Sequence, residues 1–163
     1  VLARLLRRSG VDASVKWPND VLIPVGGEFR KVAGILTEMS SEAERIKHLV
    51  IGVGINVNVE AFPPDLADRA TSLRIATGKS IDRGALLAEL LNELESVYDQ
   101  MTEQGAPFAI ALWRAHARLG VACRFLRDGR AIEGIARDID ADGALQVEDS
   151  QGRIVRVFSG EIT

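Results

Sequence analysis

Two neighbouring β-strands are predicted by Val15-Lys16-Trp17-Pro18-Asn19-Asp20-Val21-Leu22 and by Lys31-Val32-Ala33-Gly34-Ile35-Leu36. Both segments are rich in β-branched residues, and Val25-Gly26-Gly27-Glu28 between them has the composition of a tight hairpin turn. A third strand is predicted over Leu49–Val59. We therefore expect one sheet that carries two lysines, an Asn-Asp pair and several glycines, with Lys31 opening its strand just after the turn.

The third strand has an unusual arrangement of glycines. Residues two apart on a strand point to the same face, so Gly52, Gly54 and Asn56 are expected to share one face. That face would present two bare backbone positions followed by a carboxamide. A ligand lying against the sheet and the close packing of another backbone element explain this pattern equally well.

Three polar residues on the first two segments are candidates for a site. Lys31 has a compact charge that suits a carboxylate or a phosphate oxygen, although most lysines at strand ends are simply solvated. Asn19 and Asp20 follow Pro18. They could serve a Mg²⁺ ion or an incoming amine, or form an ordinary turn.

The rest of the first 119 residues alternates loops and helices. Residues 2–9 carry the pattern of an amphipathic helix ending at Gly10, and 40–47 are polar and expected to form a loop. A short helix is expected within 66–76. Asp82 is a candidate N-cap for the longest helix, whose apolar stripe contains Leu87, Leu90, Leu91, Leu94, Val97, Tyr98 and Met101. Gly105 would close it, and Pro107 would begin another helix ending at Gly120.

From Val121 onward the hydrophobic period changes toward two. Short strands are separated by Asp128-Gly129, Asp142-Gly143 and Gln151-Gly152, as in a small all-β barrel. We expect an α+β protein with a domain boundary near Gly120. Residues 1–119 would form a mixed-sheet domain with packed helices, and residues 120–163 a small barrel.

Composition excludes several function classes. The chain has 163 residues, 47% hydrophobic and 26% charged, which is ordinary globular composition. A net charge of −3 gives no general attraction to nucleic acid, and no apolar run reaches the ~18 residues that span a bilayer. A single cysteine, Cys123, excludes an intrachain disulfide and fits a cytoplasmic protein. The two histidines lie far apart, without the spacing of a zinc site.

The motifs KWPND (16–20), KVAGI (31–35) and GVGIN (52–56) together resemble the catalytic core of the biotin–protein ligases. Weaker agreement extends over Ala70-Thr71-Ser72-Leu73 and Ser159-Gly160-Glu161-Ile162. The resemblance implies a biotin/lipoate-ligase-like catalytic core followed by an SH3-like C-terminal domain. It runs from about residue 14 to the C-terminus.

The resemblance also implies roles for individual residues. Lys31 is similar to the family lysine that contacts the biotin carboxylate and the α-phosphate, and Asp20 to a catalytic or Mg²⁺-binding carboxylate. The implied biotin-binding positions are Gly34, Gly52, Gly54 and Trp17. Trp17 could equally be a buried aromatic that anchors the core. The implied nucleotide-binding residues are Lys16, Asn19 and Asn56.

In that family biotin and MgATP form biotinyl-5′-AMP, which then biotinylates a lysine of a carrier protein. The resemblance thus implies a ligase that uses ATP, Mg²⁺ and biotin and acts on the biotin carboxyl carrier protein of acetyl-CoA carboxylase. It implies no membrane partner. Homodimers through the catalytic sheet are compatible with one apolar strand face.

A Gly/Arg-rich loop of the type GRGRxGR, expected upstream of KWPND, is not matched, because Arg4, Arg7 and Arg8 lack interleaved glycines. We therefore expect the chain to be the later part of a longer protein and full activity to need the upstream segment. Three alternatives stay open. They are a lipoate–protein ligase, a biotin-sensing repressor with an upstream DNA-binding domain, and a catalytically silent binding module.

Overall fold

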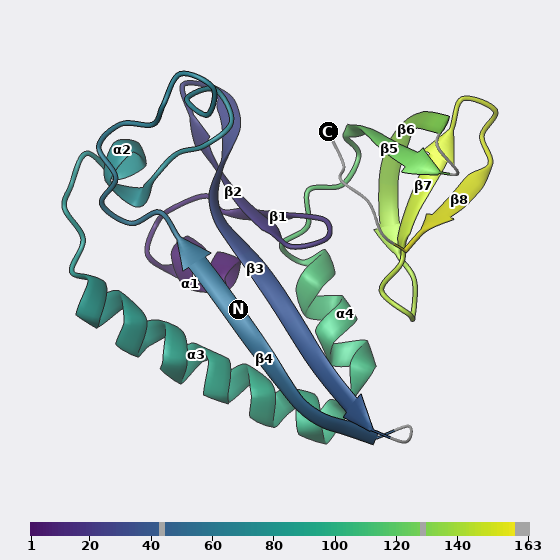
Figure 1. Cartoon of the computed structure of the whole chain (residues 1–163), viewed down its shortest axis with the longest axis horizontal. Helices are drawn as coiled ribbons and strands as arrows, with labels where there is room; N and C mark the ends of the chain where they lie inside the picture. Colours follow the sequence, from purple (N-terminus) through teal and green to yellow (C-terminus); the bar gives the residue numbers. More distant parts are fainter. Residues whose placement is uncertain (43–44, 128–129, 159–163) are drawn as a thin grey trace. The chain divides into compact units, whose positions relative to one another are not determined.

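A computed structural model describes residues 1–42, 45–127 and 130–158 of the chain (Figure 1). Helices and two four-stranded sheets alternate along it, which confirms the expected α+β class. The sheet orders are β1-β2-β3-β4 and β5-β6-β7-β8. The Asp128-Gly129 turn and the Ser159–Ile162 motif, both singled out in the sequence, lie outside the described residues.

The chain divides into two compact units. One contains residues 2–14 and 19–90, and the other contains Val1, residues 15–18 and residues 91–163. The division passes through the KWPND motif, between Pro18 and Asn19. The chain therefore enters the second unit briefly, leaves it, and returns to it after Leu90.

Strands β2 (Asp20–Val25), β3 (Glu28–Glu42) and β4 (Arg45–Ile55) form the main sheet of the first unit. Both ladders between them are antiparallel. The predicted hairpin turn is confirmed: Gly26 and Gly27 connect β2 and β3 with φ of 62° and 87°, values that glycine adopts without steric cost. Parallel contacts also occur as isolated bridges, one of them between Lys31 and Ala70.

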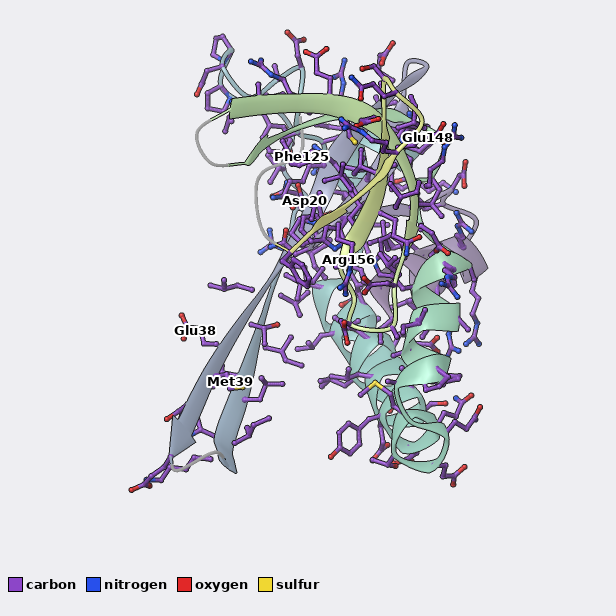
Figure 2. All side chains as sticks on the ribbon, turned by 90° about the vertical axis from the view of Figure 1, so that its right-hand side faces the viewer. Asp20, Glu38, Met39, Phe125, Glu148 and Arg156 are labelled. Carbon is purple, nitrogen blue, oxygen red and sulfur yellow. The ribbon has the colours of Figure 1, made fainter. Side chains whose placement is uncertain are left out.

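The loop expected over residues 40–47 is wrong for residues 40–42 and 45–47, and residues 43–44 lie outside the described residues. β3 runs to Glu42 and β4 starts at Arg45, with Met39 paired to Leu49 and Ser40 to His48. Glu38 and Met39, labelled in Figure 2, lie in this outer part of the hairpin, and Met39 is 59% exposed. Because both faces of the hairpin are open here, polar residues can continue the strands without breaking a buried pattern.

The helices begin and end close to the predicted residues. α1 (Leu2–Arg8) precedes Gly10, and α3 (Arg83–Gln104) starts after Asp82, whose Oδ1 accepts from the Gly84 and Ala85 amides at 2.8 and 3.1 Å. α2 (Leu73–Thr77) is shorter than expected and ends at Gly78. α4 (Ala106–Arg114) has Pro107 in its first turn, as predicted, but it ends at Arg114 rather than at Gly120.

The apolar stripe of α3 is mostly uncovered. Leu90 and Val97 are buried, whereas Leu87, Leu91 and Tyr98 are more than half exposed. The stripe thus has the predicted helical period without forming a closed core. Within the described residues, no helix combines the length and apolar character needed to cross a membrane.

The second unit contains two residues of β1 (Ser14–Lys16), namely Val15 and Lys16. It also contains the four later strands, which are β5 (Ala122–Arg127), β6 (Arg130–Ile139), β7 (Leu145–Asp149) and β8 (Ile154–Val157). The last four form an antiparallel meander, as the period of two predicts. Its core is built around Phe125, labelled in Figure 2, with Leu145 and Val147.

A charged cluster fixes the turn between β6 and β7. Arg156 donates to Asp140 at 2.5 Å and to Asp142 at 2.7 Å. The hydrogen bond from Arg156 and those from the Asp142 and Ala144 backbone lower the pKa of Asp140 below its ordinary value. Asp140 therefore stays ionised at neutral pH and holds the turn through both side-chain and backbone contacts.

Candidate functional site

The centre of the candidate site is an ion pair between neighbouring strands. The Lys31 Nζ lies 2.5 Å from Oδ1 of Asp20, so the structure brings the two predicted catalytic residues together. The side chains are 46% and 23% exposed. Water screens such a pair, and pairs of this kind contribute about 0–1 kcal/mol to stability. The contact therefore matters mainly for the position of the amine.

A β-bulge decides which way Lys31 points. Lys31 lies inside β3 rather than at its start, and it pairs with Leu22, whereas Ala33 pairs with Val21. Val32 is thus an extra residue on β3, which resets the alternation of side chains. Without the bulge, Lys31 and Gly34 would point to opposite faces. With it, Lys31 shares a face with Asp20 and Gly34.

The backbone of Lys31 is held from its other side by a segment far along the chain. The Lys31 amide donates to the Arg69 carbonyl at 2.8 Å, and the Thr71 amide donates to the Lys31 carbonyl at 2.9 Å. Ala70 forms a parallel bridge with Lys31. β4 ends at Ile55, paired with Ala33, so residues 69–71 take the next place beside β3. Lys31 is therefore fixed between two backbones.

The residues that follow this segment form hydrogen bonds with the residues just after β4. The Leu73 and Arg74 amides donate to the Asn56 and Val57 carbonyls at 3.0 and 2.9 Å. Ser72 Oγ donates to the Val59 carbonyl at 2.6 Å and accepts from the Ile75 amide as the N-cap of α2. Ser72 thus ties the residues after β4 to the segment that holds Lys31. Sequence reasoning assigned it no role, although the Ala-Thr-Ser-Leu agreement marked the place.

Replacing Ser72 with alanine is expected to lower the free energy of unfolding by about 1–2 kcal/mol, because it removes both a helix cap and a buried hydrogen bond. Chemical denaturation measures this. Ser72→Thr keeps the hydroxyl and should recover most of the loss.

The neighbouring Thr71→Val variant is the matched control. Thr71 is fully buried, and its Oγ1 has no hydrogen-bond partner among the residues that the structure describes. Removing that hydroxyl should therefore leave stability unchanged or raise it slightly. Equal losses in the free energy of unfolding of Ser72→Ala and Thr71→Val would contradict the stabilising role of the Ser72 hydroxyl.

Three glycines lie on the face that carries Lys31. Gly34 pairs with Gly54, and Leu36 pairs with Gly52, so all three glycines share one face, as the spacing predicts for the two on β4. A Cβ at Gly34 would lie 3.1 Å from both Lys31 Cε and Nζ. At Gly52 and Gly54 a Cβ would meet nothing closer than 3.7 Å. The amine therefore lies directly over Gly34, beside open backbone.

Asn56 and Asn19 lie at the edges of this face. Asn56 follows β4 instead of lying on it. Its backbone N–H donates to the backbone carbonyl of Val32, the extra residue of the bulge, at 2.8 Å. Asn19 precedes Asp20, and its Nδ2 donates to the Ile35 carbonyl at 2.7 Å while its own carbonyl accepts from the Ile35 amide at 2.9 Å. Asn19 thus extends the β2–β3 ladder by one position.

Lys16 and Trp17 belong to the second unit. Trp17 is 9% exposed and packs in the core that contains Phe125 and Val147, and its Nε1 donates to the Gly143 carbonyl at 3.1 Å. The buried-anchor alternative for Trp17 is therefore the one that matches its surroundings. Lys16 lies beside it in β1, half-buried.

The metal chemistry of the site is limited to one carboxylate. No group of three or more His, Cys, Asp or Glu side chains that could hold a metal occurs within the described residues. A single carboxylate such as Asp20 suits a Mg²⁺ ion that is bound mainly by nucleotide phosphates. Such an ion commonly takes one or two protein carboxylates, and phosphates and water fill its other positions.

Two family models match the chain. The one described as "Biotin/lipoate A/B protein ligase family" matches residues 2–56, which contain Asp20, Lys31, Gly34, Gly52 and Gly54. The one described as "Biotin protein ligase C terminal domain" matches residues 119–163.

Individual relatives agree with these matches. The bifunctional ligase/repressor BirA of Bacillus spizizenii is 38% identical over 158 residues, covering 94% of this chain and 47% of the relative. The biotin–[acetyl-CoA-carboxylase] ligase of Mycobacterium tuberculosis is 34% identical, covering 99% and 56%. A biotin protein ligase from Aquifex aeolicus, solved in complex with biotin and ATP, is 29% identical with a TM-score of 0.77, covering 98% of this chain and 64% of that one.

The chain spans about half the length of the curated relatives. Within that length its sequence is similar to theirs, and its fold is similar to that of the Aquifex aeolicus enzyme. The chain therefore belongs to the biotin protein ligase family.

Proposed function

We propose that this chain is part of an ATP-dependent biotin–protein ligase and that the glycine-lined face around Lys31 binds biotin and the α-phosphate of ATP. The observation that carries the proposal is the Lys31 amine, held by Asp20 over Gly34. The Aquifex relative, named for its complex with biotin and ATP, supports the ligand assignment.

In the first step the biotin carboxylate attacks the α-phosphorus of ATP. The bond from that phosphorus to the bridging oxygen breaks, and biotinyl-5′-adenylate and pyrophosphate form. Negative charge builds on the α-phosphate oxygens as this happens. The fixed Lys31 ammonium offsets it, and a cation placed in advance needs no reorganisation during the reaction.

In the second step the amine of a carrier-protein lysine attacks the acyl carbon of the mixed anhydride. An amide bond forms, AMP leaves, and the amine proton must be removed. Asp20 lies next to the Lys31 amine, where a carboxylate can orient an incoming amine or accept its proton. No covalent enzyme intermediate is needed.

The glycines of this face would line the biotin-binding part. Gly52 and Gly54 leave the backbone open there, and Gly34 leaves room for the Lys31 amine. Asn19 and Asn56, at the edges of this face, are proposed for the nucleotide, with Asp20 holding its Mg²⁺. The nucleotide-binding role of Lys16, which belongs to the second unit, stays a prediction from the family resemblance. We do not extend the biotin-binding role to Trp17, whose ring is packed in the core of the second unit.

Exchange of radiolabelled pyrophosphate into ATP tests the first step in the full-length protein. We expect exchange that depends on biotin and not on lipoate. Exchange supported by lipoate alone would reassign the protein to lipoate–protein ligation. Absence of exchange with either acid would contradict ligase activity and favour a silent binding module.

The acceptor protein is proposed from the name of a relative. The Mycobacterium relative is named for acetyl-CoA carboxylase, so we propose the biotin carboxyl carrier protein of that enzyme as the acceptor. Cytoplasmic location, homodimerisation and a domain boundary near residue 120 stay predictions.

Repression of transcription is a second candidate activity, favoured by the name of the Bacillus relative. It would require a DNA-binding part, and the net charge of −3 gives no general attraction to nucleic acid. Biotin-dependent binding of the full-length protein to its own promoter region would support it.

A further inference from the structure

The backbone of Lys31 takes its hydrogen bonds from a segment far along the chain but in the same unit, residues 69–71. Apart from proline, a residue has one backbone N–H and one carbonyl, and Lys31 bonds both of them to this segment. The N–H donates to the Arg69 carbonyl at 2.8 Å, and the carbonyl accepts from the Thr71 amide at 2.9 Å. The place of residues 69–71 therefore acts directly on the backbone that carries the Lys31 amine.

The residues just before this segment give it little packing. Residues 63–66 are exposed, and the backbone hydrogen bonds here are those of local turns, such as the one from the Ala70 amide to the Leu66 carbonyl at 2.8 Å. From β3, the Arg30 side chain reaches the turn with a hydrogen bond to the Ala67 carbonyl at 3.0 Å. Solvent therefore surrounds most of this end of the segment.

The other end is buried and is fastened by Ser72. Thr71 and Ser72 are both fully buried. The Ser72 hydroxyl donates to the Val59 carbonyl at 2.6 Å and accepts from the Ile75 amide at 3.0 Å. The Thr71 hydroxyl, in contrast, has no hydrogen-bond partner among the residues that the structure describes. Ser72 therefore supplies side-chain hydrogen bonds one residue away from the contact with Lys31.

The residues to which Ser72 is tied return to β3 beside Lys31. The Leu73 amide donates to the Asn56 carbonyl at 3.0 Å, and the Asn56 amide donates to the Val32 carbonyl at 2.8 Å. Removing the Ser72 hydroxyl would leave two backbone groups without this partner inside the unit, which costs more than the mere absence of a hydrogen bond. The contact between residues 69–71 and Lys31 would then open more often.

We propose that Ser72 is a positioning residue for Lys31. Its hydroxyl holds residues 69–71 beside β3 and so fixes the Lys31 backbone, and with it the amine that lies over Gly34. The tolerance is small, because a Cβ at Gly34 would already lie 3.1 Å from that amine. The effect on catalysis rests on the proposed function, in which the cation must be in place before charge develops.

Amide hydrogen exchange in the full-length protein tests the structural part without any ligand. The Lys31 amide reports on the contact with residues 69–71. The Ile35 amide is the internal reference, because it lies on the same strand but donates to the Asn19 carbonyl. In Ser72→Ala we expect the Lys31 amide to exchange about tenfold faster while the Ile35 amide is unchanged. Equal acceleration of both amides, or no acceleration at Lys31, would overturn the proposal.

Single-turnover adenylation at saturating biotin and ATP tests the catalytic part. We expect the rate to fall about tenfold in Ser72→Ala. Ser72→Thr keeps the hydroxyl, so it should restore both the slow exchange of the Lys31 amide and the rate of adenylation. A wild-type rate in Ser72→Ala, or no recovery in Ser72→Thr, would overturn the proposal.

Asp82→Ala is the matched control. Asp82 caps α3, and its Oδ1 accepts from the Gly84 and Ala85 amides in the same unit. Its truncation therefore also removes a helix cap, but it leaves the hydrogen bonds of Ser72 in place. We expect lower stability with an unchanged Lys31 amide and an unchanged rate of adenylation. The same acceleration and the same loss of rate as in Ser72→Ala would show a general loss of stability and overturn the proposal.

Ser72→Gly decides the matter if Ser72→Ala does not fold. Glycine is nearly as good an N-cap as serine, so α2 keeps its start while the hydrogen bond to Val59 is lost. Faster exchange of the Lys31 amide is again expected, and an unchanged Lys31 amide would overturn the proposal. A wild-type protein without adenylation activity would contradict the proposed function instead. The exchange result would still decide the role of Ser72.

Discussion

Replacing Lys31 with methionine in the full-length protein lowers the rate of biotinyl-adenylate formation by about 10²–10³-fold, the usual effect of removing one group that stabilises charge in a transition state. Methionine keeps much of the length of the side chain and removes its charge. The α-phosphate oxygens then gain charge without a fixed cation beside them. Single-turnover formation of the adenylate, followed at saturating biotin and ATP, measures the loss.

Lys47→Met is the control for this experiment. Lys47 lies on β4 of the same hairpin and pairs with Glu42 at 2.8 Å, so it matches Lys31 in residue type and in type of contact. It lies near the hairpin tip, away from Asp20 and the glycines. We expect it to retain wild-type rates. A rate in Lys31→Met within a few-fold of wild type would exclude the proposed role of Lys31.

Replacing Gly34 with valine weakens binding of biotin by about 100-fold while the fold is retained. A Cβ there already comes within 3.1 Å of the Lys31 Cε and Nζ, and valine adds two methyl groups. The lysine tip is flexible and can move aside, so the cost falls on the position of the amine rather than on the sheet. Overpacking costs of about 1–3 kcal/mol correspond to this change in affinity.

Thr37→Val controls for adding apolar bulk to β3. Thr37 lies three residues from Gly34 and therefore on the opposite face, paired with Ile51. Titration calorimetry with biotin, together with thermal unfolding, should show normal affinity and stability for this variant. Normal affinity in Gly34→Val would mean that biotin does not use the face that carries Lys31.

The local elements of the fold were largely predictable from sequence because their signals are local. The Gly26-Gly27 turn, the Asp82 cap and the helix end at Gly105 each depend on a few adjacent residues. The same holds for the period-two pattern of the C-terminal sheet. Residues 40–42 and 45–47 form strands although their polarity predicted a loop, because polarity indicates a loop only where one face of a strand must be buried.

The geometry of the site was less predictable. Lys31 and Asp20 were singled out, but nothing in Lys31-Val32-Ala33 marks Val32 as an extra residue, since a bulge depends on the partner strand. The backbone hydrogen bonds between Lys31 and residues 69–71 join segments almost forty positions apart in the sequence, and no local pattern predicts them. The surroundings of Trp17 likewise depend on a sheet more than a hundred residues later.

The most direct test of the site is calorimetric titration of the full-length protein with a non-hydrolysable biotinyl-adenylate analogue, alongside its lipoyl counterpart and with Lys31→Met in parallel. Both halves of the proposed ligand and the central lysine are then examined in one measurement. We predict tight binding of the biotinyl compound alone and a loss of about 100-fold or more in the variant. Preference for the lipoyl compound, or equal binding by wild type and variant, would contradict the account.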